Sequence, residues 1–340
     1  MDIDPATYVQ KTIERAVSEE SISQKLCFMC GNDPSNGLGE HVFPRWLQKK
    51  FEIRDLSLTL LNQSKIPYRK LTVPCCERCN TGFLSRLESQ VKDRIESGET
   101  LHKKDYLMFG RWISKILIGI LTKEASLPAD RSQPDKGTIL KPTFADNFFI
   151  AHMLLQSARK KTTFSCLHSE FPMTLYHYRI KGDAHRGFDI TTNFVGASVA
   201  VVLGNLGLVF VNDGGMQMEI GPKGPFALLG AEVSFAQFRE LSARIHCKSS
   251  LRDATYFYLN SETPELLQMN QVRVDSYSGN NTMFQDWDDI RLSHFIEMYV
   301  GIERDKIFLK DAQACGSIVV DEKMNLIDCP ISSAGIENFA

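Results

Sequence analysis

Long hydrophobic runs are missing from this sequence. No stretch approaches the roughly 18 consecutive apolar residues that a membrane-spanning helix needs. The most apolar segment, Ile113 to Leu121, has only nine residues and contains Lys115, so we expect it to form a buried helix. The first ten residues are acidic and lack the hydrophobic centre of a secretion signal. The sequence therefore predicts a cytoplasmic protein that does not interact with membranes.

An excess of charge of one sign is also missing, as are internal repeats and low-complexity tracts. The 39 Lys and Arg residues are balanced by 41 Asp and Glu residues, which gives a formal net charge of −2. Any nucleic-acid-binding surface must therefore be local, because the whole chain is not basic. With 340 residues, 43% of them hydrophobic, the chain is long enough for two domains with apolar cores.

The distribution of apolar residues predicts an α+β protein. A stretch rich in proline and charge at 126–137 separates a first domain, 1–125, from a second, 138–340. We expect an antiparallel sheet in the second domain, and N-caps at Asn80 and Ser234. Helices are predicted at 1–22, 81–95, 105–123, 146–160, 235–246 and 290–300, and strands at 57–61, 71–73, 173–180, 190–211, 227–233 and 255–259.

Five of the nine cysteines lie in two short segments of the first domain. Cys27 and Cys30 form one Cys-x-x-Cys unit, and Cys76 and Cys79 form another, with 45 residues between the two units. Two such units complete a tetrahedral site for a structural Zn²⁺ ion. The odd number of cysteines argues against a disulfide framework. The alternatives are buried free cysteines, or a redox pair that would leave the second unit unexplained. Cys75 is interpreted as a small core residue.

Residues of complementary chemistry accompany the cysteine units. Glu40 and His41 follow the first unit, and Asn80 directly follows the second. Carboxylate and amide oxygens suit a hard divalent cation, and a histidine with an unperturbed pKa of ~6.5 suits a general base. The simpler interpretations are a strand-end histidine, a solvated carboxylate and a helix N-cap. Glu88 either faces this site or pairs with Lys92, and we favour the pairing.

Three segments together resemble the HNH nucleases, the zinc-stapled branch of the ββα-metal fold. They are CFMCG at 27–31, EHVFPRWL at 40–47 and VPCCERCNTGFLSRLE at 73–88. The resemblance extends over residues 25–95, about a quarter of the chain, and has the two cysteine units, the Glu-His pair and the Cys-Asn dipeptide in the family's order. It implies a small ββα-metal domain at the N-terminal end of the chain.

The resemblance also implies a reaction and the residues that perform it. His41 would be the general base, and Glu40 and Asn80 would bind a catalytic Mg²⁺ or Mn²⁺ ion during hydrolysis of phosphodiester bonds in DNA. The last motif position holds asparagine instead of histidine, which is a common variant in the family. The family's middle asparagine has no counterpart, because the corresponding residues are YRKLT at 68–72 and the nearest asparagine is Asn62.

The segment between His41 and Val73 is locally basic. It contains seven Lys and Arg residues against two acidic ones, with Trp46 and Tyr68 among them. Such a segment fits contact with a phosphate backbone without base reading, and a solvated basic face is the simpler alternative. We expect DNA contacts from Arg45, Lys49, Lys50, Arg69 and Lys70.

Residues 138–340 contain no recognisable motif. By analogy with proteins that resemble the first domain, the chain would belong to a bacterial phage-defence or mobile-element system, and the second domain would sense a signal, regulate cleavage or bind a protein partner. The main alternative to an endonuclease is a zinc-knuckle module that binds nucleic acid or protein without cleaving. Only the nuclease requires Glu40, His41 and Asn80 to converge.

Overall fold

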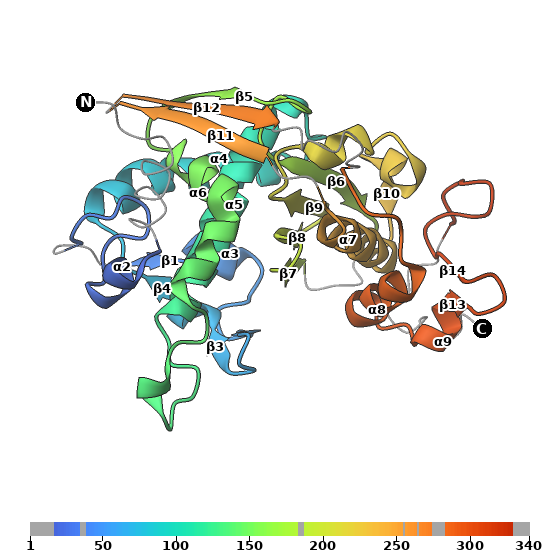
Figure 1. The fold of residues 1–340 in the computed structure, drawn as a ribbon, viewed down its shortest axis with the longest axis horizontal. Coiled ribbons are helices and arrows are strands. Elements are labelled where there is room, and N and C mark those ends of the chain that lie inside the picture. The colour runs from blue at the N-terminus through green and yellow to red at the C-terminus, as the bar shows by residue number, and fades with distance from the viewer. Residues whose placement is uncertain are drawn as a thin grey trace. The chain divides into compact units, whose positions relative to one another are not determined.

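The computed structural model describes residues 17–34, 39–182, 187–253, 256–263, 265–273 and 283–328. The protein is a mixed α+β chain with several small sheets (Figure 1). Its contacts divide it into two compact units, Met1–Ser165 with Tyr258–Asn270 and Cys166–Phe257 with Gln271–Ala340. The helix predicted over 1–22 lies largely outside the described residues, which contain α2 (Glu19–Ser23).

A two-stranded sheet followed by a helix lies at the start of the first unit. β1 (Glu40–His41) pairs antiparallel with β4 (Thr72–Val73), with Glu40 opposite Val73. After β4, the π-helical segment η2 (Arg78–Leu84) continues directly into α4 (Ser85–Ser97). Between the two strands the chain forms α3 (Arg45–Lys50), the hairpin of β2 (Ser57–Thr59) and β3 (Lys65–Pro67), and the 3₁₀ turn η1 (Tyr68–Lys70).

Helix α5 (Lys103–Ala125) forms the core of the first unit. Every residue from Trp112 to Thr122 is buried, which confirms the predicted buried helix. Gly119 allows close packing, because a Cβ atom there would lie 3.0 Å from Cγ2 of Val42, the residue after β1. The helix thus packs directly against the strand that carries Glu40 and His41.

The first unit extends beyond the predicted boundary. The exposed stretch at 126–137 contains the 3₁₀ turn η3 (Pro134–Lys136). After it, η4 (Pro142–Phe148) and α6 (Phe149–Gln156) pack on α5. β5 (Lys161–Ser165) then joins β11 (Tyr256–Glu262) and β12 (Leu266–Arg273) in a three-stranded sheet. The division therefore falls after Ser165, and a late segment of the chain returns to the first unit.

A five-stranded sheet with the order β10-β6-β9-β8-β7 forms the second unit's framework. It is antiparallel as predicted, except that β10 pairs parallel with β6. The stretch predicted as one strand at 227–233 is mostly not extended, because the 3₁₀ helix η6 (Gly224–Leu228) precedes β10. The strands are β6 (Thr174–Ile180), β7 (Phe188–Asn193), β8 (Ser198–Leu203), β9 (Leu206–Val211) and β10 (Glu232–Val233).

Helix α7 (Phe235–Ser250) packs between this sheet and α8 (Asp289–Val300) (Figure 1). Ser234 caps α7 as predicted, because its hydroxyl accepts a hydrogen bond from the Gln237 amide. Short elements complete the unit: η5 (Met216–Glu219), α9 (Arg304–Ile307), β13 (Phe308–Leu309) and β14 (Ala314–Cys315). Within the described ranges, no helix has both the length and the apolar character needed to cross a bilayer.

Candidate metal centre and active site

The four predicted zinc ligands form one cluster in the first unit. The Sγ atoms of Cys27, Cys30, Cys76 and Cys79 all lie within 4.8 Å of one another. Those of Cys30 and Cys76 are 3.6 Å apart. A tetrahedral site with Zn–S bonds of about 2.3 Å has sulfur–sulfur separations of roughly 3.8 Å, so the cluster fits a zinc ion.

Two tight turns present these thiols. The Gly31 amide donates to the Cys27 carbonyl at 2.8 Å, and the Cys79 amide donates to the Cys76 carbonyl at 3.1 Å. Gly31 has a φ of 70°, in the left-handed region that glycine adopts readily. A backbone hydrogen bond of 2.9 Å from Phe28 to Pro74 joins the two turns. Residues more than 40 positions apart in the sequence thus form one site.

The remaining cysteine of these segments, Cys75, lies beside the cluster. Its side chain is fully buried, and its Sγ is 3.9 Å from that of Cys27. The hydrogen bonds from Cys30 and Cys75 lower the pKa of the Cys27 thiol, whereas the same contact with Cys27 raises the pKa of Cys75. Cys75 is therefore a buried neighbour of the four ligands, as the sequence predicts.

Asn80 lies within a helix and does not cap one. It is the third residue of η2, which begins at Arg78, so the predicted N-cap is wrong. Its side-chain nitrogen instead donates to the Gly39 carbonyl at 3.0 Å, immediately before β1. Gly39 has a φ of +73°, and a Cβ atom there would lie 3.3 Å from the Val73 carbonyl. The amide nitrogen is thereby engaged, and the amide oxygen is the atom left to bind a ligand.

Glu40 belongs to a buried ion cluster with a lysine of α5. The Nζ atom of Lys115, which is fully buried, lies 2.6 Å from Oε1 of Glu40 and 2.9 Å from Oε1 of Glu88. The same ammonium donates to the carbonyls of His41 at 2.5 Å and Val42 at 3.1 Å. One cation thus holds two carboxylates and the backbone of β1, and the three side chains keep a formal charge of −1.

Lys115 is the site residue that sequence reasoning missed, and Glu88 is a residue for which it favoured another role. The favoured pairing with Lys92 is wrong, because the Glu88 carboxyl faces Lys115. Burial raises the pKa of Glu88 to about 7, Lys115 opposes this rise, and Glu40 adds to it. A signal was present in the sequence: Lys115 interrupts an apolar helical run, and a lysine that cannot reach water requires carboxylate partners.

His41 occupies a different environment from its neighbour Glu40. Successive residues of a strand point to opposite faces, and His41 is only half-buried whereas Glu40 is buried. Desolvation and the nearby Arg45 lower the pKa of His41, and Glu40 acts in the opposite direction. The neutral imidazole, which can accept a proton, is therefore favoured at neutral pH.

The three predicted catalytic residues lie on adjacent backbone segments without direct side-chain bonds. Asn80 bonds to Gly39, the residue before Glu40, and His41 follows Glu40 on β1. Within the described part of the chain, no hydrogen bond or ion pair joins the side chains of Glu40, His41 and Asn80. Asn62 takes no part, since its side chain bonds to Ala129 and Ser64.

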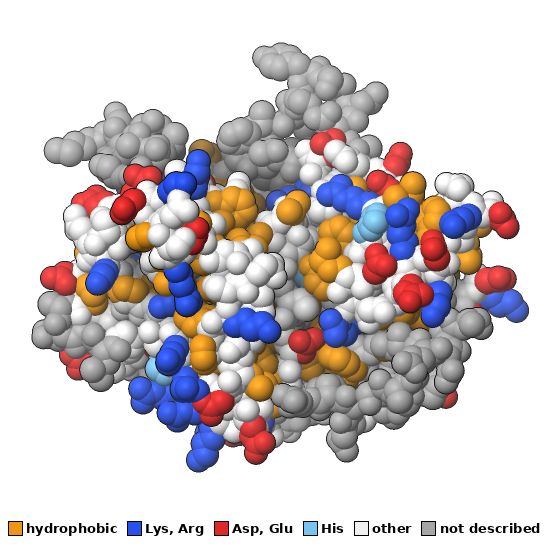
Figure 2. All heavy atoms as spheres, turned by 90° about the horizontal axis from the view of Figure 1, so that it is seen from below, with side chains coloured by type: hydrophobic (Ala, Val, Ile, Leu, Met, Phe, Trp, Pro, Cys, Tyr) orange, Lys and Arg blue, Asp and Glu red, His pale blue; other side chains and the backbone are white. Residues whose placement is uncertain are grey.

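The predicted basic surface is only partly available. Arg69 pairs with Asp55, and Lys50 lies 3.8 Å from Glu96. Tyr68, which lies in the basic segment of the sequence, is not part of this surface, because its ring is buried edge-on against Phe43. Figure 2 shows Lys and Arg side chains gathered at the lower left of the face it presents, beside a histidine. Of the five residues expected to contact DNA, three are exposed and form no ion pair in the described structure: Arg45, Lys49 and Lys70.

Comparison of the chain with models of protein families, with curated proteins and with solved structures finds no match. The function must therefore be argued from the geometry of the cysteine cluster, the Glu40–Lys115–Glu88 ion cluster and the residues beside them.

Proposed function

We propose that the first unit is a metal-dependent endonuclease of the HNH kind, which hydrolyses phosphodiester bonds in DNA. One observation carries the proposal: the Asn80 amide bonds to the backbone directly before Glu40 and His41. The antiparallel pair β1–β4, the helix after it and the four-cysteine cluster produce this juxtaposition. The order of elements is the one that the resemblance to HNH nucleases implies.

His41 is assigned the role of general base. Its lowered pKa favours the neutral imidazole at neutral pH, which accepts a proton from the attacking water. Its half-buried position leaves the ring accessible from solvent. The hydrogen bond from Lys115 to the His41 carbonyl fixes the backbone from which the imidazole projects.

Asn80 and Glu40 are assigned as the residues that hold a catalytic Mg²⁺ or Mn²⁺ ion. When bound, such an ion stabilises negative charge on the phosphate and on the leaving oxygen. Asn80 offers its amide oxygen, because its amide nitrogen donates to Gly39. Glu40 offers a carboxylate that already accepts from Lys115 through Oε1 and is hydrogen-bonded to Glu88. Oxygen atoms of this kind suit a hard cation.

Plasmid cleavage in the presence of Mg²⁺ or Mn²⁺ tests the proposal. We expect His41→Ala to lower the rate by ~10²–10⁴ and to leave the zinc content unchanged, because His41 is not in the cysteine cluster. His294→Ala, which removes an exposed histidine of α8, is the matched control and should cleave like the wild type. Asn80→Ala should be partly rescued by high Mn²⁺, whereas His41→Ala should not.

Two results would overturn this assignment. One is cleavage at the wild-type rate by His41→Ala. The other is a folded, zinc-loaded wild-type protein that fails to cleave DNA in the presence of either Mg²⁺ or Mn²⁺. The second result would favour a zinc-knuckle module that binds nucleic acid without cleaving it. That alternative is supported by the Glu40–Lys115 ion pair, which takes up one of the carboxylate oxygens.

A further inference from the structure

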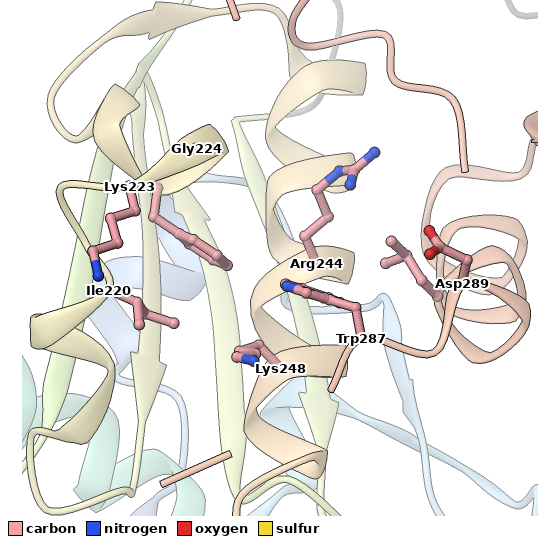
Figure 3. A pocket seen from close by; sticks show the side chains of 9 residues that line it. Ile220, Lys223, Gly224, Arg244, Lys248, Trp287 and Asp289 are labelled. Carbon is pink, nitrogen blue, oxygen red and sulfur yellow. The ribbon is translucent and has the colours of Figure 1, made fainter. Parts of the chain in front are cut away.

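A cavity of about 410 Å³ lies in the second unit, and none of its lining residues is assigned to the proposed nuclease. It opens between the segment that leads into η6, helix α7 and the start of α8 (Figure 3). Its volume is in the range of sites for small molecules. The lining residues are Ile220, Lys223, Gly224, Phe226, Arg244, Lys248, Trp287, Asp289 and Leu292.

Two aromatic rings form one part of this cavity. The rings of Phe226 and Trp287 are nearly parallel, with an interplanar angle of 17° and centroids 6.4 Å apart. Phe226 is buried, whereas Trp287 is 41% exposed, an unusual state for the largest apolar side chain. The exposed indole offers a face on which a planar ring can stack.

Three cations and one carboxylate surround the aromatic part. In Figure 3, Lys223 lies on one wall, Asp289 on the opposite one, and Arg244 and Lys248 project from α7 between them. Arg244 is paired with Glu240 outside the lining, so Lys223 and Lys248 are the cations that favour an anion here. Asp289 adds an acceptor that suits hydroxyl or amino groups of the same ligand.

The cations differ in how firmly they are already held. The Arg244 guanidinium donates to Glu240 at 2.7 Å and to the Gly316 carbonyl at 2.8 Å, so that it is fixed by the fold. The Lys248 ammonium has one long hydrogen bond, 3.5 Å to the Gln285 carbonyl, and lies 5.0 Å from the centre of the Trp287 ring. Lys248 also lies 4.8 Å from the centre of the Phe284 ring, and its ammonium keeps donors for a ligand beside the stacking surface.

We propose that this cavity binds a nucleoside 5′-phosphate, with the base on Trp287, the phosphate at Lys248 and Lys223, and a hydroxyl or amino group donating to Asp289. Each part of such a ligand then meets a group of matching chemistry. An inorganic anion would leave the aromatic surface unused, and an uncharged aromatic compound would leave the cations unpaired. The proposal does not depend on the nuclease assignment, because the two sites share no residue.

Isothermal titration calorimetry of the full chain with AMP, GMP, CMP and UMP, without added divalent metal, tests this proposal. We expect at least one of the four to bind with a Kd below about 1 mM and at least about tenfold more tightly than its nucleoside or inorganic phosphate. Trp287→Ala should weaken that binding roughly tenfold or more, as loss of base stacking does. Lys248→Met should weaken it by a similar factor, and Lys248→Arg should restore part of it.

Two controls place the binding in this cavity. Lys310→Gln alters an exposed lysine of the second unit that lies outside the lining and should bind like the wild type. Lys49→Gln alters the basic surface of the first unit and should also leave the affinity unchanged. The proposal is overturned if none of the four nucleotides binds at about 1 mM. It is equally overturned if nucleoside or phosphate binds as tightly as the nucleotide, or if Trp287→Ala has no effect while circular dichroism shows an intact fold.

Discussion

Replacement of Lys115 by methionine should strongly destabilise the first unit. The ammonium is fully buried and is the only cation in contact with the carboxylates of Glu40 and Glu88 among the described residues. Methionine fills a similar volume but provides no charge and no donor. Two carboxylates would then remain beside each other in the core, and the carbonyls of His41 and Val42 would lose a donor.

The size of the loss follows from this geometry. Removal of one partner from a buried ion pair typically costs about 3–5 kcal/mol of unfolding free energy, since an unpaired charge stays behind. Protonation of Glu88, whose pKa is about 7, limits the cost below neutral pH. We therefore expect the loss to be larger at pH 8 than at pH 6. Lys115→Met combined with Glu88→Gln should recover part of the loss, because one of the two stranded charges is absent.

Native-state hydrogen exchange of the α5 amides at increasing urea concentrations measures the unfolding free energy of the first unit, and hence its loss in Lys115→Met. Lys123→Met is the matched control on the same helix. Its Nζ atom makes one hydrogen bond of 3.2 Å to the Thr72 carbonyl, so its loss should cost only about 1 kcal/mol. If Lys115→Met is no more destabilising than Lys123→Met, the ion cluster does not stabilise the fold as argued.

Three further predictions concern other parts of the molecule. Metal analysis should find about one zinc per chain, and Cys30→Ser should lose it together with much of the first unit's stability, since structural zinc contributes on the order of 10 kcal/mol. Burial lowers the pKa of His246 to about 3, so the contribution of neutral His246 to the stability of the second unit is fully present above pH 6.5 and is lost as the pH falls toward 3. The loss should reach roughly 3 kcal/mol at a pH of about 4.5. Urea unfolding followed by circular dichroism should show it in full in the wild type and in His294→Ala, and in smaller measure in His246→Gln, where the buried His152, whose pKa is about 4, still contributes. Lys49→Gln should lower the slope of DNA affinity against salt by ~0.9, whereas an unchanged slope, as expected for Lys310→Gln, would mean that Lys49 does not contact DNA.

Features governed by short-range patterns could be predicted from the sequence. The two Cys-x-x-Cys units specify their own turns, and the structure brings them together as expected. The N-cap Ser234 and the apolar helix around Trp112 were also predictable from local signals. The extent of the first unit was not, because the pairing of β5 with β12 joins segments about 100 residues apart and follows no local pattern.

The side-chain contacts inside the candidate site could not be predicted from the sequence, for a related reason. Sequence spacing placed Asn80 at a helix start, but the helix begins earlier, and the amide bonds to a backbone carbonyl 41 residues away. Spacing also suggested Lys92 for Glu88, although a partner at i+4 on an exposed helix face contributes only about 0.3–0.5 kcal/mol. The buried ammonium of Lys115 is much more costly to leave unpaired than the ammonium of Lys92, a residue that is only partly buried. Glu88 therefore pairs with Lys115 and not with its neighbour on the same helix.

The ion cluster also explains how a long core helix determines the geometry of a two-residue strand. β1 and β4 form a ladder too short to hold its own register. Two contacts from α5 support it: the Lys115 ammonium binds the carbonyls of His41 and Val42, and Gly119 lets the Val42 side chain approach the helix backbone. The position of the His41 imidazole therefore depends on the burial of α5. It follows that Gly119→Leu, at a position that packs on Val42 and not on a proposed catalytic side chain, should lower plasmid cleavage while the chain still binds zinc. Cleavage at the wild-type rate by this variant would show that α5 does not position His41.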